Sequence, residues 1–214
     1  QLLHEFEAAG DALRNGDSHY ALALLGRIRT IMKVCVTQVD ILETMTPLQF
    51  NAFRDYLSSS SGFQSAQFRK VEATLGRRDN KMAGHLPPAM QAEIKSITDS
   101  PSIWDSFLIY VSGRGFDIPA EILQRDPSIA YASNVAVQDA LLLLHRTDAE
   151  AAMVSERLLD IDEGIQEWRY RHVKMVERTI GAKMGSGGSS GVQYLASTLF
   201  NPVFKDLWEI RSRF

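Results

Sequence analysis

Cysteine is almost absent from this chain of 214 residues, and Cys35 is its single example. One cysteine cannot form a disulfide within the chain, nor can it build a thiolate cluster for zinc or an iron–sulfur centre. Histidine, aspartate and glutamate therefore remain as possible metal ligands. Independence from disulfides is typical of proteins in a reducing compartment, so we expect a cytoplasmic location.

Long apolar runs and a strong net charge are lacking as well. The apolar stretches Ala21–Leu25 and Ala140–Leu144 are far shorter than the roughly 20 residues that a membrane-spanning helix needs. The formal net charge of −3 gives no electrostatic reason to expect nucleic acid or an anionic membrane as a partner. We therefore expect a globular protein that binds neither of them.

Alternating strand patterns are missing, and apolar residues recur instead at three- and four-residue spacing. The longest such segment runs from about Asp148 to Ile180 and is closed by Gly181. Its apolar stripe consists of Val154, Leu158, Ile161, Ile165, Trp168, His172, Met175 and Thr179. This pattern predicts one long amphipathic helix that ends at a glycine cap.

Shorter periodic segments fill much of the remaining chain. One covers about His19 to Thr46, and the Thr46-Pro47 pair then marks the start of a helix that extends to about Leu57. Ser100-Pro101 gives the same start signal for a helix through Val111. We predict a single all-α domain over residues 1–214, a bundle of long helices without a dividing linker.

His172 is the histidine with the most informative position. Of the five histidines in the chain, it alone lies on the apolar stripe in the middle of a strongly amphipathic helix. A buried imidazole needs a partner, because an unsatisfied polar group costs about 1–3 kcal/mol. It is either a core histidine bonded to a carbonyl or carboxylate, or an axial ligand of haem iron. Position alone favours the core histidine.

Arg54 is the second candidate, on the same helix face as Phe50 one turn earlier. Its planar fork suits a substrate carboxylate, although a structural salt bridge is the commoner role for such an arginine. The Gly/Ser loop Gly185–Gly191 is open to three interpretations: a mobile lid, an anion-binding nest or a plain connector.

Acidic residues gather at Asp160, Asp162 and Glu163 on the longest predicted helix. An exposed helix face explains this cluster, and we therefore assign it no chemistry. No two histidines lie four residues apart, as a His/Glu zinc pair would need, and no strand is predicted that could hold a nucleophilic serine elbow. Residue patterns alone thus give an all-α protein with one unusual histidine.

Two longer motifs carry a family resemblance. The first consists of Phe53-Arg54-Asp55-Tyr56-Leu57, Ser60-Ser61-Gly62-Phe63-Gln64-Ser65, Gln67-Phe68-Arg69 and Glu72. The second consists of Trp168-Arg169-Tyr170-Arg171-His172-Val173, Ile180-Gly181, the Gly185–Gly191 loop and Tyr194-Leu195. They resemble the distal-side segment, and the proximal helix with its closing loop, of the tryptophan 2,3-dioxygenase family. Weaker similarity extends over nearly all the chain, including Leu42-Glu43-Thr44-Met45-Thr46-Pro47.

The resemblance implies the fold and several residue roles. It implies the all-helical bundle of the tryptophan/indoleamine dioxygenase type, with haem b whose iron is ferrous in the active state. His172 matches the proximal haem ligand, and Arg54 matches the arginine that binds the substrate carboxylate. Phe50 stands where family members often have a tyrosine, so one hydroxyl contact to the carboxylate is missing.

Further implied roles fall on two loops. Ser186 stands where the family usually has a threonine that hydrogen-bonds the substrate's ammonium and carboxylate, and Ser61 and Gly62 match the loop lining the distal pocket. The family's distal histidine corresponds to a position upstream of Gln1, so we expect no catalytic residue within these 214 positions. The opening Leu2, Leu3 and Phe6, which have the pattern of an apolar helix face, suggest a preceding segment.

The implied activity is insertion of O2 across the indole 2,3 bond of L-tryptophan to give N-formylkynurenine, as in the kynurenine pathway of tryptophan catabolism. A homotetramer is implied as well. Two alternatives remain: a haem monooxygenase of the same superfamily that hydroxylates a substituted tryptophan or other aromatic amino acid, and a non-catalytic haem-binding module.

Overall fold

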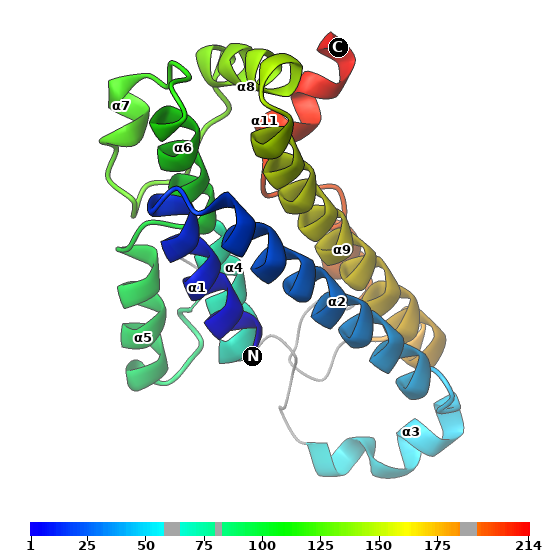
Figure 1. The fold of residues 1–214 in the computed structure, drawn as a ribbon. Helices are drawn as coiled ribbons and strands as arrows, with labels where there is room; N and C mark the ends of the chain where they lie inside the picture. The colour runs from blue at the N-terminus through cyan, green and yellow to red at the C-terminus, as the bar shows by residue number, and fades with distance from the viewer. Residues whose placement is uncertain (58–64, 80–82, 185–191) are drawn as a thin grey trace. The chain divides into compact units, whose positions relative to one another are not determined.

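The computed structural model describes residues 1–57, 65–79, 83–184 and 192–214. In this part every regular element is a helix and no strand occurs, which confirms the predicted all-α fold. In chain order the elements are α1 (Leu2–Arg14), α2 (Ser18–Leu42), α3 (Pro47–Arg54), η1 (Asp55–Leu57), α4 (Ala66–Leu75), α5 (Pro88–Thr98), α6 (Ile103–Gly113), α7 (Ala120–Leu123), α8 (Val135–Thr147), α9 (Ala149–Ile180), α10 (Val192–Ala196), α11 (Lys205–Glu209) and η3 (Ile210–Arg213). The longest elements are α9 with 32 residues and α2 with 25 (Figure 1).

The chain forms two compact units. The first comprises residues 1–29, 66–162 and 203–214, and the second comprises residues 30–65 and 163–202. The helices α2 and α9 contribute residues to both units. The expectation of a single domain over residues 1–214 stays a prediction.

In the first unit, α1 packs against α4 and α6, α4 against α5, and α8 against α11 and η3. Completely buried apolar side chains form its core, among them Leu13, Leu25, Phe107, Leu141 and Phe204. Burying one such side chain contributes about 1.5–3 kcal/mol. None of the helices in the described ranges is long and apolar enough to cross a membrane.

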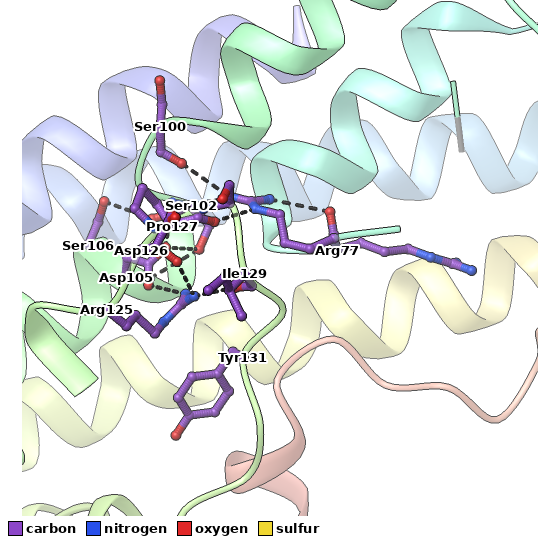
Figure 2. A network of polar contacts seen from close by, with 12 residues as sticks. Arg77, Ser100, Ser102, Asp105, Ser106, Arg125, Asp126, Pro127, Ile129 and Tyr131 are labelled. Atoms are coloured by element: carbon purple, nitrogen blue, oxygen red, sulfur yellow. Dashed lines mark hydrogen bonds and ion pairs between the residues drawn. The ribbon is translucent and has the colours of Figure 1, made fainter. Parts of the chain in front are cut away.

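Arg125 and Arg78 connect the loop before α8 to residues at and just before the beginning of α6. Figure 2 labels Arg125 together with Asp105 and Ile129. Arg125 forms an ion pair with Asp105 in the first turn of α6 and donates to the Ile129 carbonyl at 2.6 Å. Arg78 donates to the carbonyl of Pro127 at 2.6 Å and to that of Ser100 at 3.0 Å. These bonds satisfy carbonyl groups that a loop leaves without helical partners.

One predicted helix start is wrong by two residues. The Ser100-Pro101 pair does not begin α6; the N-cap is Ser102, whose hydroxyl accepts from the Asp105 amide at 3.2 Å. The Asp105 carboxylate accepts in return from the Ser102 amide at 2.7 Å, which completes a capping box. This pair of bonds outweighs the proline signal, and the helix also ends later than predicted, at Gly113.

The second unit holds the end of α2, α3, η1, the end of α9 and α10. Thr46 caps α3 as predicted, because its hydroxyl accepts from the Gln49 amide and the Gln49 side chain accepts from the Thr46 amide. Helix α9 ends at Gly181, whose φ of +60° is unfavourable for a residue with a side chain. Predictions for both ends of this helix are confirmed to within one residue.

Candidate functional site

His172 lies in the part of α9 that belongs to the second unit. Upstream along the stripe Leu158, Ile161 and Ile165 are buried, whereas Trp168 and His172 are half-buried. The Trp168 indole stacks on the imidazole one turn later, with ring centroids 5.2 Å apart and planes 11° apart. The apolar stripe is thus only partly covered where the histidine stands, and the stacked indole restricts the orientation of the imidazole.

The His172 side chain is suited to bind a metal ion. Burial lowers the pKa of His172 from its ordinary value, so the imidazole is neutral at pH 7. Within the described ranges no hydrogen bond or ion pair involves its ring nitrogens, so a core histidine bonded to a carbonyl or carboxylate finds no support. A neutral nitrogen with a free lone pair is what an axial ligand of haem iron provides. The residues present therefore fit haem.

A haem site and a site built from several protein ligands differ in the number of side chains that they need. Among the described residues, no group of three or more His, Cys, Asp and Glu side chains is placed to hold a metal ion. A haem iron needs only one or two protein ligands, because the porphyrin supplies the other four.

Three neighbouring arginines anchor the turns of α9 around His172. Arg169 is buried and donates to the carbonyls of Thr198 at 3.4 Å and Asn201 at 3.2 Å. Arg171 pairs with Asp40 and Glu43 at the end of α2, and Arg178 pairs with Glu43. The motif around His172 contained Arg169 and Arg171, but its pattern gave no indication of these distant partners.

Arg54 is the last residue of α3 and is half-buried. Its Nη2 donates to the carbonyl oxygen of Met184 at 2.7 Å. No ion pair of Arg54 exists in the described part of the chain, so the structural salt bridge considered above finds no support there. Phe50, one turn earlier and half-buried, packs edge-on against Phe53 with ring centroids 5.4 Å apart.

The remaining predicted site residues lie outside the described residues. They are Ser61, Gly62 and Ser186. Met184 is the last described residue before the Gly185–Gly191 loop, and it precedes Ser186 by two positions. The bond from Arg54 therefore joins the helix that carries the proposed carboxylate-binding arginine to the start of the segment that carries Ser186.

The interpretation of the acidic cluster was wrong for Asp162. Its side chain is completely buried and accepts from the amides of Val203 and Phe204, both at 2.9 Å. It also accepts from the Trp208 indole at 3.0 Å. Asp162 thus organises the chain before α11 within the first unit. The available signal was its position four residues after the buried Leu158, on the same face of the helix.

The chain is similar to known proteins over nearly its whole length. The family model for tryptophan 2,3-dioxygenase matches residues 1–85 and 128–214. A tryptophan 2,3-dioxygenase of Anaeromyxobacter dehalogenans is 52% identical over 213 residues, which are 99% of this chain and 80% of the relative. The enzyme of the same name from Herpetosiphon aurantiacus is 49% identical over 99% of this chain and 82% of its own length. The tryptophan 2,3-dioxygenase of Kineococcus radiotolerans is 38% identical over 99% of this chain and 76% of its own length. This chain therefore belongs to the tryptophan 2,3-dioxygenase family.

Proposed function

We propose that this chain is a haem-dependent dioxygenase that inserts both atoms of O2 across the indole 2,3 bond of L-tryptophan, yielding N-formylkynurenine. The observation that carries the proposal is membership of the family, with relatives named tryptophan 2,3-dioxygenase at up to 52% identity over almost the whole chain. Because the relatives given above carry the dioxygenase name, the monooxygenase alternative is not favoured.

His172 is proposed as the residue that holds haem b. Its neutral, half-buried imidazole supports this role. When bound, haem with ferrous iron supplies the oxygen chemistry of the reaction. The contribution of the protein is to fix the imidazole, which the Trp168 stack and the anchored turns of α9 achieve.

Arg54 is proposed to bind the carboxylate of tryptophan. A guanidinium carries five N–H donors, and the Met184 carbonyl takes one of them in this structure. The remaining donors suffice for a bidentate bond to a carboxylate, while the bond to Met184 holds the fork in one orientation. Phe50 packs on the same helix and contributes apolar surface, without the hydroxyl that a tyrosine would add.

Ser186, Ser61 and Gly62 keep the roles that the resemblance implies. Ser186 would hydrogen-bond the ammonium and carboxylate of the substrate, since serine retains the hydroxyl of the usual threonine. Ser61 and Gly62 would line the pocket around the indole. Together with Arg54, these contacts would fix the amino-acid end and thereby the position of the ring.

We also propose a homotetramer and a cytoplasmic location. Ile41, Leu48 and Tyr56 in the second unit expose 68%, 81% and 89% of their surface, and subunit contacts that cover such side chains would stabilise the fold. The single free Cys35 supports a reducing compartment and thus a cytoplasmic enzyme of tryptophan catabolism.

The product's mass tests the function. The reduced, haem-loaded protein is given L-tryptophan under ¹⁸O₂, and the product is analysed by mass spectrometry. Incorporation of two labelled atoms is the expected result. One labelled atom would indicate the monooxygenase, and no product from a protein that retains haem would indicate a non-catalytic haem-binding module.

A further inference from the structure

Glu43 lies between α2 and α3 and bonds to α9, and no sequence pattern assigns it a role. It follows directly on the last residue of α2 and precedes Pro47, the first residue of α3, by four positions. Its side chain is only 9% exposed. Its Oε2 accepts from Arg171 at 2.9 Å and from Arg178 at 3.2 Å.

Arg171 and Arg178 lie on either side of His172 in the sequence of α9. They are seven residues apart on α9, which corresponds to two helical turns, so both side chains emerge on the same side of the helix. His172 follows Arg171 directly. A carboxylate that binds both arginines therefore fixes the rotation of α9 about its own axis along the stretch that carries the proposed haem ligand.

Glu43 also lies close in sequence to the beginning of α3. Three residues separate Glu43 from Pro47, and the Thr46 capping box makes the first turn of α3 rigid. At its other end, α3 is held by the bond from Arg54 to the Met184 carbonyl. The helix with the proposed carboxylate-binding arginine is thus bonded to Met184 at its last residue and joined to Glu43 by a three-residue connection before its first.

Burial of one carboxylate oxygen of Glu43 has an unfavourable effect on the free energy of folding. Its second oxygen, Oε1, is buried and has no hydrogen-bond partner in the part of the chain that the structure describes. A buried acceptor without a donor destabilises the fold, so stability alone gives little reason for a carboxylate here. Positioning of two functional helices gives such a reason.

We propose that Glu43 is a positioning residue that holds α3, with Arg54, in register with the turns of α9 that carry His172. The inference rests on the proposed function, because it assumes tryptophan at Arg54 and haem at His172. Small displacements of binding groups are costly, since a bidentate bond tolerates little change in geometry. Loss of the bonds from Arg171 and Arg178 to Glu43 should therefore weaken binding of the substrate carboxylate at Arg54.

The test uses Glu43→Gln, which keeps the shape of the side chain and removes its charge. Dissociation constants for L-tryptophan are measured from the haem absorption spectrum of the loaded protein, in the wild-type and in the Arg54→Lys background. We expect Glu43→Gln to keep full haem content and to weaken tryptophan binding about tenfold. In the Arg54→Lys background the same change should cost less than about twofold, because coupled residues are not additive.

Two further variants complete the design. Glu177→Gln is the matched control: it lies on α9 and pairs with the exposed Lys174 at 2.7 Å, and it should leave binding unchanged. Arg178→Gln removes one of the two partners of Glu43 at a side chain that is 64% exposed, so it should fold and weaken binding by a smaller factor. It decides the question if Glu43→Gln does not fold.

Equal losses in both backgrounds, or wild-type binding by Glu43→Gln or by Arg178→Gln, would overturn the positioning role and leave the proposed function intact. Wild-type protein that binds no haem, or haem but no tryptophan, would overturn the proposed function and the inference with it.

Discussion

Arg54 and Met184 are 130 positions apart in the sequence, yet the guanidinium of Arg54 donates to the carbonyl oxygen of Met184 at 2.7 Å. This bond links the end of α3 to the residue that precedes the Gly185–Gly191 loop. It also fixes the orientation of a guanidinium that keeps further donors for a ligand. The proposed binding of a carboxylate at Arg54 therefore starts from an arginine that is already oriented.

Replacement of Arg54 by glutamine should raise KM for tryptophan by about 10- to 100-fold, since hydrogen bonds to charged groups contribute about 1.5–3 kcal/mol. Steady-state kinetics of the haem-loaded variant measure the effect. Arg146→Gln, at an exposed position on α8, is the control and should keep the wild-type KM. A KM that Arg54→Gln leaves unchanged would show that Arg54 has only a structural role.

Asp162→Asn should destabilise the fold by about 2–4 kcal/mol, because the amide exchanges one acceptor oxygen for a donor that faces the donors of Val203, Phe204 and Trp208. Asp160→Asn is the matched change two residues earlier, in half-exposed ion pairs with Arg29 and Arg157, and should cost less than about 1 kcal/mol. Urea unfolding of both variants gives the comparison. Similar losses for the two would contradict the role assigned to Asp162.

Gly181→Ala and Gly26→Ala should have opposite effects on the free energy of unfolding. Gly181 has a φ of +60°, so a side chain there should cost about 1 kcal/mol. Gly26 lies inside α2, and a Cβ at this position meets no atom within 4 Å, so alanine should stabilise by about 0.5–1 kcal/mol. Thermal unfolding measures both, and a stabilising Gly181→Ala would contradict the glycine cap at the end of α9.

The stability of the protein should fall as the pH is lowered below about 6.5, the ordinary pKa of histidine. Burial lowers the pKa of His145, while the facing Glu156 raises it and Arg211 lowers it, so the unfolded chain binds the proton at a higher pH than the folded chain. The unfolded state then gains protons first, and each such histidine removes at most about 1.4 kcal/mol per pH unit. This loss begins near the unfolded pKa and stops once the folded histidine is protonated.

His145→Gln tests this source of the pH dependence. The Nε2 of His145 is buried without a partner among the described residues, and its ring packs edge-on against Phe214 at 5.2 Å between centroids. Urea unfolding between pH 5 and pH 7 should show a smaller pH slope for the variant than for the wild-type protein. Identical slopes would mean that His145 does not titrate differently in the two states.

Local sequence signals predicted those parts of the fold that local interactions determine. The apolar stripe and Gly181 gave both ends of α9, and Thr46 with Pro47 gave the start of α3. The start of α6 was misplaced because Ser100-Pro101 resembles a cap, whereas the capping box between Ser102 and Asp105 decides it. The capping box between Ser102 and Asp105 is itself a local interaction, so the start of α6 is still determined locally, two residues later than the Ser-Pro pair indicates.

Contacts between distant segments were beyond the reach of sequence patterns. Asp162 was assigned to an exposed face, because its partners at Val203 and Phe204 follow it by about 40 positions and leave no local trace. For the same reason the pairs of Glu43 with Arg171 and of Arg54 with Met184 were not foreseen. The roles of His172 and Arg54 came from family motifs, and both remain proposals.

The most direct test of the account is His172→Gly with exogenous imidazole. Glycine removes the imidazole nitrogen that would ligate the iron, so the variant should lose haem or its wild-type absorption spectrum. Added imidazole can enter the cavity that glycine leaves, and it should restore the spectrum because it replaces the missing ligand. The account predicts loss of the wild-type spectrum in the variant and its recovery with imidazole. Full haem content and a wild-type spectrum without imidazole would contradict His172 as the axial ligand.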